Sequence, residues 1–172
     1  MSGEHGRTHR VGDELPPLEI PLTRTLIVAG AIASRDYQDV HHDADLAREK
    51  GSPDIFMNIL TTNGLVGRYI TDHFGPTAVL RKVAIRLGAP NYPGDVMRLT
   101  GRVMGLTGEA PVLAEVSVTG DNGIGRHVTG TVTVALPDTE TETDTDTDTE
   151  TDTETDIGTG TGTATDTQGA GT

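Results

Sequence analysis

Alternation of apolar and polar residues dominates the second half of the chain. Four segments place β-branched or long apolar side chains at nearly every second position: residues 82–87, 97–103, 112–119 and 128–134. Such alternation is typical of antiparallel strands that bury one face. Turn-forming residues separate the segments, at 90–94, 105–111 and 121–123. The pattern therefore predicts four strands that follow one another as a meander.

Two segments in the first half are apolar in other ways. Residues 24–32 are almost continuously apolar, and we interpret them as a fifth, buried strand. Between residues 59 and 73 the apolar side chains recur at helical spacing, and Asn58 stands where an N-cap would lie. Gly64 and Gly67 would weaken an exposed helix. We therefore expect this helix to pack closely against a sheet that wraps around it.

The order of these segments indicates a fold class. A short helix is expected over residues 44–49, between the first strand and the long helix. One long helix and a curved antiparallel sheet make an α+β domain. The pattern gives this class and does not distinguish between the small folds within it.

The two ends of the chain differ from its middle. Eleven of the 26 acidic residues, and none of the 13 basic ones, lie in residues 137–172, where threonine alternates with aspartate or glutamate. The net charge of -13 therefore belongs mainly to this segment. With almost nothing apolar to bury, we expect it to be a disordered acidic tail. Residues 1–16 are also expected to be flexible, which leaves 17–136 as one domain.

Composition excludes several classes of function. The chain has no cysteine, which rules out disulfides, a thiol nucleophile and cysteine-ligated zinc. The middle of the chain has no basic field for nucleic acid, and no apolar run is long enough to cross a membrane. Neither a secretory signal nor a glycine-rich phosphate loop is visible, so we expect a cytoplasmic protein without a nucleotide cofactor.

Candidate chemistry is concentrated in residues 34–47, where two histidines lie among four acidic residues. Three interpretations are open. A metal site could use the histidine pair and Asp43, but adjacent residues converge poorly on one ion and no metalloprotease spacing is present. A structural interpretation makes Asp36, Asp39 and Asp43 loop caps. An acid–base interpretation pairs a histidine with a nearby carboxylate, through a shared proton or water.

The same segment resembles the signature of the MaoC-type (R)-specific enoyl-CoA hydratases. That signature is Asp, any residue, Asn, Pro, an aliphatic residue and His, followed shortly by Asp and Ala. Five positions of this chain match it: Asp36, Val40, His41, Asp43 and Ala47. Gln38 and Asp39 depart from the Asn and Pro of the signature, while the Asp-to-His spacing of five is kept.

Longer runs resemble the small subunit of actinobacterial steroid side-chain enoyl-CoA hydratases. They are residues 35–43, 54–61, 64–66, 68–69 and 86–88, and the resemblance covers about residues 18–136. It implies a hotdog fold and addition of water to a trans-2-enoyl-CoA, with a steroid side-chain thioester as a candidate substrate. It also implies assembly with a second hotdog subunit. Because a single hotdog would leave a sheet edge uncovered, a homodimer is the alternative assembly.

The resemblance assigns roles to particular residues. Asp36 and His41 would together hold and activate the water and return a proton to the substrate. Backbone N–H groups near Ile59 and Leu60 would stabilise the enolate oxygen, with no metal and no cofactor. The family usually has His-Gly where this chain has Asn58-Ile59, so Asn58 is either a substrate contact or a plain helix cap.

Other charged residues receive weaker interpretations. Five basic residues could meet the phosphates of coenzyme A or could simply be solvated: Arg68, Arg81, Lys82, Arg86 and Arg98. Four histidines are expected at the surface: His5, His9, His73 and His127. His42 is expected either to be exposed or to support the catalytic residues without taking part itself. Two rival functions stay open, a hotdog thioesterase and a scaffold subunit without catalysis. The presence of both Asp36 and His41 favours a catalytic chain.

Overall fold

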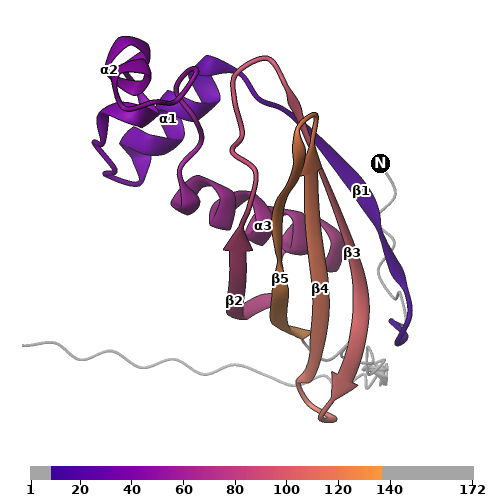
Figure 1. Cartoon of the computed structure of the whole chain (residues 1–172). Coiled ribbons are helices and arrows are strands. Elements are labelled where there is room, and N and C mark those ends of the chain that lie inside the picture. The colour runs from indigo at the N-terminus through magenta and orange to yellow at the C-terminus, as the bar shows by residue number, and fades with distance from the viewer. Residues whose placement is uncertain (1–8, 137–172) are drawn as a thin grey trace, which may run out of the picture. The chain divides into compact units, whose positions relative to one another are not determined.

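Residues 9–136 are described by the computed structural model, and they form a curved antiparallel sheet around one long helix. Figure 1 shows this helix, α3, lying in the hollow of the sheet. The helices are α1 (Arg24–Ala33), the 3₁₀ turn η1 (Asp39–His41), α2 (Ala44–Glu49) and α3 (Ile59–Phe74). The strands are β1 (Glu14–Pro21), β2 (Val79–Leu87), β3 (Val96–Thr107), β4 (Val112–Asn122) and β5 (Gly125–Leu136). The predicted α+β class is confirmed.

The long helix begins and ends as its sequence predicts. The side chain of Asn58 caps it by accepting a hydrogen bond of 3.0 Å from the Thr61 N–H. The helix ends at Gly75, whose φ of 94° is a conformation that favours glycine. One face of the helix, with Val66 and Ile70, is buried against the sheet.

The predicted close approach of helix and sheet occurs at one of the two helix glycines. A Cβ added at Gly67 would lie 3.2 Å from a methyl group of Leu80, near the start of β2. A Cβ added at Gly101 of β3 would lie 3.1 Å from the ring of Tyr69. Gly64 is exposed, and a Cβ added there would meet no atom within 4 Å. The prediction of close packing at Gly64 is therefore wrong.

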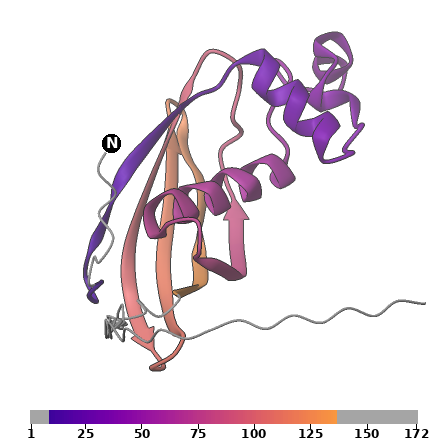
Figure 2. The ribbon, with the colours of Figure 1, turned by 180° about the vertical axis from the view of Figure 1, so that it is seen from behind.

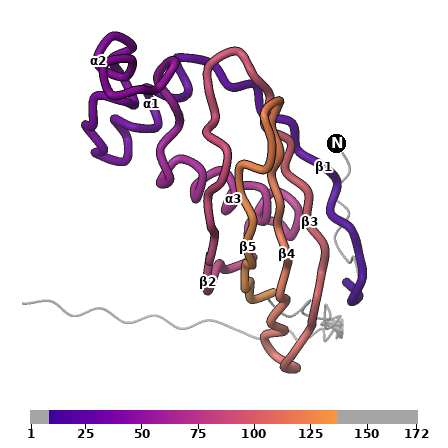
Figure 3. The backbone as a smooth tube through the Cα atoms, viewed as in Figure 1, coloured from indigo at the N-terminus to yellow at the C-terminus, as the bar shows by residue number. Residues whose placement is uncertain are grey.

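The four predicted strands form, but their order in the sheet is not a simple meander. The order is β1-β3-β4-β5-β2, with every pair antiparallel. β3, β4 and β5 follow one another as predicted, whereas β2 pairs with β5 and lies at the sheet edge, as Figure 3 also shows. The chain between β2 and β3 therefore crosses the sheet instead of forming a hairpin. Alternation predicts strands, but it carries no information about which strands are neighbours.

The fifth strand of the sheet is β1, and it is not the segment that the sequence indicates. Residues 24–32, interpreted above as a strand, belong to α1. Thr23 caps this helix by accepting a hydrogen bond of 3.0 Å from the Leu26 N–H. A short apolar run is compatible with a buried helix or a buried strand, and the N-cap at Thr23 favours the helix.

β1 itself begins within the range expected to be flexible. It starts at Glu14, buries Leu15 and Ile20, and contains Pro16 and Pro17. Prolines are tolerated here because β1 is an edge strand, and a register shift accompanies them between Leu15 and Leu18. The expectation for residues 1–16 thus fails at residues 14–16. The predicted acidic tail, 137–172, lies outside the described residues.

The remaining helices gather at one end of α3. Figure 2 shows α1 and α2 beside the N-terminal end of α3, beyond the end of the sheet. α1 packs on α3 closely, because a Cβ added at Gly30 would lie 2.2 Å from the Thr61 hydroxyl oxygen. Over residues 9–136 no helix is both long and apolar enough to cross a membrane. This helical corner carries the segment with the candidate chemistry.

Candidate active site

Asp36 is anchored to the C-terminal end of α1. The Arg35 N–H donates to the Ile32 carbonyl at 3.0 Å, and the Asp36 N–H donates to the Ala31 carbonyl at 2.9 Å. These two bonds form the Schellman pattern that ends many helices. Arg35 takes the left-handed conformation, with φ at 57°, where glycine is usual. Such a strained backbone conformation costs about 1 to 3 kcal/mol and is often found at functional sites.

His41 is held by the segment that leads into α3. Its Nδ1 lies 2.7 Å from the Phe56 carbonyl, and the Phe56 N–H donates to the Val40 carbonyl at 3.0 Å. A carbonyl oxygen only accepts, so Nδ1 carries the proton and Nε2 is an acceptor in the neutral ring. The Phe56 ring meets the imidazole edge-on, with centroids 5.0 Å apart. The ring position and the tautomer of His41 are therefore both fixed.

The two side chains meet as the five-residue spacing predicts. Asp36 Oδ2 lies 3.4 Å from His41 Nε2, and the side chains are 18% and 8% exposed. When the ring is neutral, both atoms are acceptors, so a molecule with two O–H groups can donate to both. When the ring is protonated, the two groups form an ion pair. The pair can therefore hold a water molecule and take up one of its protons.

Asn58 contacts this pair from the start of α3. Its side chain donates 3.0 Å to Asp36 Oδ2 and 2.9 Å to the Ser34 hydroxyl oxygen, while its own oxygen accepts from Thr61. Both N–H groups of the amide are used, and the residue is only 2% exposed. The helix-cap interpretation is confirmed. A direct substrate contact finds no free donor on this side chain.

The first two backbone N–H groups of α3 differ from the fully bonded amide of Asn58. Ile59 and Leu60 follow the cap, and in the described part of the chain neither backbone N–H has a hydrogen-bond partner. The two residues are 46% and 49% exposed. Free N–H groups at a helix N-terminus attract negative charge, reinforced by the helix dipole. The predicted pair of oxyanion donors thus follows directly after the residue that binds Asp36, in two residues that are partly open to solvent.

A salt bridge joins α1 to the segment before α3. Arg24, in the first turn of α1, donates to both carboxylate oxygens of Asp54, at 3.0 and 2.7 Å. The hydrogen bond from Arg24 lowers the pKa of Asp54 and raises that of Arg24 itself. This contact ties the helix that carries Asp36 to the segment that carries Phe56.

The other acidic residues of the segment have structural roles. Asp39 pairs with Lys50 at 2.7 Å, and this partner lowers the pKa of the Asp39 carboxyl. Asp43 caps α2 by accepting from the Asp45 and Leu46 N–H groups. His42 is exposed, as expected, with Nε2 3.2 Å from the Tyr37 carbonyl. Among residues 9–136 no group of three or more metal-ligating side chains is placed to hold an ion.

His127 is not the surface residue that the sequence suggests. It is 1% exposed, its Nδ1 lies 2.7 Å from the Ala89 carbonyl, and its Nε2 lies 2.9 Å from the Thr62 hydroxyl. Burial lowers the pKa of this imidazole. Thr62 belongs to the first turn of α3, so the histidine links β5 to the helix behind the site. Only the fold brings these segments together.

His9 and His73 are also not simple surface groups. Their rings contact Phe74, each with centroids 4.7 Å apart, at the C-terminal end of α3. This ring cluster lies at the opposite end of the helix from the Asp36–His41 pair. His5 lies outside the described residues.

The basic residues proposed for coenzyme A fall into two groups. Arg68 and Arg98 are paired with Asp72 and Glu19, at 3.1 and 2.8 Å. The other three are exposed on β2 and form no ion pair within residues 9–136: Arg81, Lys82 and Arg86. For these three β2 residues, contact with the phosphates and plain solvation both stay open.

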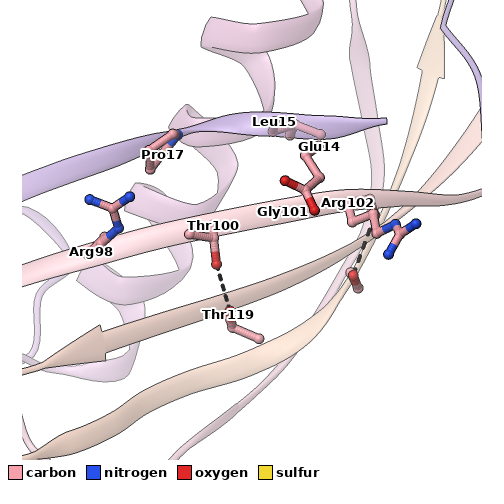
Figure 4. A pocket seen from close by; sticks show the side chains of 9 residues that line it. Glu14, Leu15, Pro17, Arg98, Thr100, Gly101, Arg102 and Thr119 are labelled. Atoms are coloured by element: carbon pink, nitrogen blue, oxygen red, sulfur yellow. Dashed lines mark hydrogen bonds between the residues drawn. The ribbon is translucent and has the colours of Figure 1, made fainter. Parts of the chain in front are cut away.

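A hollow on the sheet does not coincide with the site. Its volume is about 410 Å³, and it lies over β1, β3 and β4. Figure 4 shows Arg98, Arg102 and the hydrogen-bonded Thr100 and Thr119 around it. These side chains alternate with the buried ones of β3, so the hollow is on the sheet face that points away from α3. It includes neither Asp36 nor His41.

Comparison with known proteins places the chain in a family. No protein-family profile matches it. It is 46% identical over 129 residues to the 3-oxo-4,17-pregnadiene-20-carboxyl-CoA hydratase beta subunit of Mycobacterium tuberculosis, covering 75% of this chain and 98% of that one. The ChsH1-ChsH2 complex of the same organism contains a chain with a TM-score of 0.71 and 45% identity, over 75% of this chain and 99% of that one. An (R)-hydratase from A. caviae involved in PHA biosynthesis has a TM-score of 0.69 at 19% identity, over 77% and 100%, and shares the hotdog fold. The chain therefore belongs to the MaoC-like hydratase family, as a single-hotdog member related to the mycobacterial hydratase beta subunit.

Proposed function

We propose that this chain is the catalytic subunit of an enoyl-CoA hydratase, which adds water to the double bond of a trans-2-enoyl thioester. One observation carries the proposal. A carboxylate and an imidazole, Asp36 and His41, meet at 3.4 Å beside the free N–H groups that begin α3. Hydration needs these three elements: acceptors for a water, a proton for the α-carbon and donors for the thioester oxygen.

The reaction follows from this geometry. Water donates its two O–H groups to Asp36 Oδ2 and His41 Nε2. Its oxygen forms a bond to the β-carbon while the pair takes up one proton. The electrons of the double bond move to the thioester oxygen, where the Ile59 and Leu60 N–H groups stabilise the negative charge. The pair then returns a proton to the α-carbon, so that one water is added in total. Because Asp36 and His41 are coupled, they act as one acid–base unit.

The substrate and the partner are proposed from the relative. Its name states that it acts on 3-oxo-4,17-pregnadiene-20-carboxyl-CoA, a bulky acyl-CoA, and the related solved structure is a complex of two different chains. We propose the same substrate class and a second hotdog subunit for this chain. A coenzyme A thioester substrate also accords with action in the cytoplasm.

The β2 edge supports such an assembly. Within residues 9–136 β2 pairs only with β5, so its other side is open, and Val79 and Leu80 are 49% and 37% exposed. An open apolar edge strand invites pairing with another chain. The opposite edge, β1, is interrupted by Pro16 and Pro17, which cannot donate to a ladder. The β2 edge is therefore the better surface for a partner sheet.

The test is a hydration assay with the purified chain and its partner. A trans-2-enoyl-CoA is added, and the loss of the conjugated thioester absorbance is followed together with free thiol. We expect the absorbance to fall with gain of one water and without thiol release. Release of thiol instead would favour the thioesterase alternative.

Substitutions assign the activity to this chain. Asp36→Asn and His41→Ala should each lower turnover by about a hundredfold or more, the usual contribution of a general acid–base group. His42→Ala is the matched control, because this exposed neighbour does not contact Asp36. Circular dichroism checks folding. If the first two variants retain near wild-type turnover, the chain is a scaffold and the partner holds the catalytic groups.

A further inference from the structure

The orientation of the Asn58 amide is fixed from both ends. The Thr61 N–H can only donate, so it must face the Asn58 oxygen, which it does at 3.0 Å. The amide nitrogen is then turned toward α1, where it meets the Ser34 hydroxyl at 2.9 Å and Asp36 Oδ2 at 3.0 Å. A flipped amide would place oxygen against a carboxylate and nitrogen against an N–H, so the flip is excluded.

Ser34 adds a second constraint from the end of α1. Its hydroxyl donates to the Gly30 carbonyl at 2.7 Å, within the helix that carries Asp36. With its only proton used there, the Ser34 oxygen accepts from Asn58. Asn58 therefore joins the C-terminal end of α1 to the N-terminal end of α3 through two donated hydrogen bonds.

From this geometry, and resting on the hydration proposed above, we infer that Asn58 is a positioning residue. It keeps the Asp36 carboxylate turned toward His41 and in a fixed position relative to the Ile59 and Leu60 N–H groups. The residue that starts the helix of the oxyanion donors also holds the carboxylate of the acid–base pair. Its bond to Oδ2 is to the same oxygen that faces His41, so the amide sets how this oxygen is presented to a water.

A plain helix cap would use only the oxygen of Asn58. Aspartate and serine cap helices about as well as asparagine, so a cap alone tolerates both. Only asparagine also donates to Asp36 at this position. In Asn58→Asp a carboxylate would face a carboxylate, and in Asn58→Ser the side chain would be too short to reach Asp36. The two functions of the side chain can therefore be separated by substitution.

The experiment compares Asn58→Asp and Asn58→Ser with Thr23→Ala, in the complex with the partner subunit. Thr23 caps α1 and has no contact with Asp36, so its loss measures the effect of a lost cap alone. We expect both Asn58 variants to lower kcat by about ten- to a hundredfold, the usual value of a hydrogen bond to a charged group. KM should change less than about threefold, because the substrate is not contacted. Thr23→Ala should lower the melting temperature and leave kcat unchanged.

The outcomes separate this inference from the proposed function. If Asp36→Asn abolishes turnover while Asn58→Asp and Asn58→Ser keep wild-type kcat, the hydratase stands and the positioning role is wrong. If no enoyl-CoA is hydrated by the wild-type complex, the proposed function fails. A crystal structure of the Asn58→Ser variant then decides the positioning role by itself. An unchanged distance of 3.4 Å between Asp36 Oδ2 and His41 Nε2 would overturn it.

Discussion

The contact between α1 and α3 gives a prediction whose size can be worked from the structure. The two helices cross at Gly30 and Thr61, where an added Cβ at Gly30 would lie 2.2 Å from Thr61 Oγ1 and 2.8 Å from Thr61 Cγ2. Real Cβ atoms do not approach other atoms this closely, so either the Thr61 side chain or one of the two helices must shift in Gly30→Ala. Such overpacking usually costs about 1 to 3 kcal/mol. Alanine offsets part of it, because it favours a helix over glycine by about 1 kcal/mol.

A second substitution should relieve the clash. Thr61→Ala removes both close atoms and leaves only Thr61 Cβ, at 3.1 Å from the added Cβ. The Thr61 hydroxyl is buried without a hydrogen-bond partner among the described residues, so its removal should change stability by less than about 1 kcal/mol. In the double variant the helix preference of alanine then appears without the clash. The expected coupling energy is about 1 to 3 kcal/mol, in the direction of rescue.

The assay is urea unfolding of the four proteins of this double-mutant cycle, with turnover measured alongside. Gly30→Ala should lose stability and turnover together, because α1 carries Asp36 and α3 begins at the residue that holds it. The double variant should recover both. Gly30→Ala as stable as wild type, with a coupling energy near zero, would refute the close contact between α1 and α3.

Three further predictions concern other parts of the molecule. Burial lowers the pKa of His127 below its unfolded value of about 6.5. The stability that the buried neutral ring contributes is therefore complete above that pH and is lost as pH falls below it. In urea unfolding between pH 5 and 8, the free energy of unfolding should depend less steeply on pH in His127→Asn than in the wild type. Deleting residues 137–172 should leave melting temperature and turnover unchanged, and a loss of several degrees would contradict this. Val79→Glu should weaken assembly with the partner in sedimentation measurements, whereas Glu115→Gln, on the central strand β4, should not. A fully active monomer at micromolar concentration would argue against the proposed assembly.

Local signals made part of this structure predictable. The central helix was readable because a helical period, an N-cap residue and a terminal glycine coincide between Asn58 and Gly75. The Asp36–His41 pair was readable because a spacing of five along one loop keeps two side chains close whatever surrounds them. The family and the hotdog fold are confirmed, while the catalytic roles of the pair remain predictions.

Other features depend on contacts between distant segments. Residues 24–32 form a helix because Thr23 caps it and Gly30 fits against α3, and the apolar run alone does not contain this information. His127 is buried because α3 places Thr62 over it, from 65 residues earlier in the sequence. The position of β2 at the sheet edge likewise depends on its pairing with β5, the last strand in the sequence.

The anchoring of the site has a consequence for how the molecule folds. The hydrogen bonds that directly hold Asp36, His41 and Asn58 join residues between Gly30 and Thr61, so these three side chains are held by short-range contacts. The sheet is the opposite, since β1 pairs with β3 and β2 pairs with β5, and the members of each pair lie far apart in the sequence. Non-local pairing of this kind is slow, whereas short loops close rapidly. The contacts that directly orient the candidate catalytic groups thus come from one continuous stretch of about thirty residues. A graft of this stretch onto another hotdog sheet would carry these contacts with it, but it would also need partners in place of Arg24 and His127.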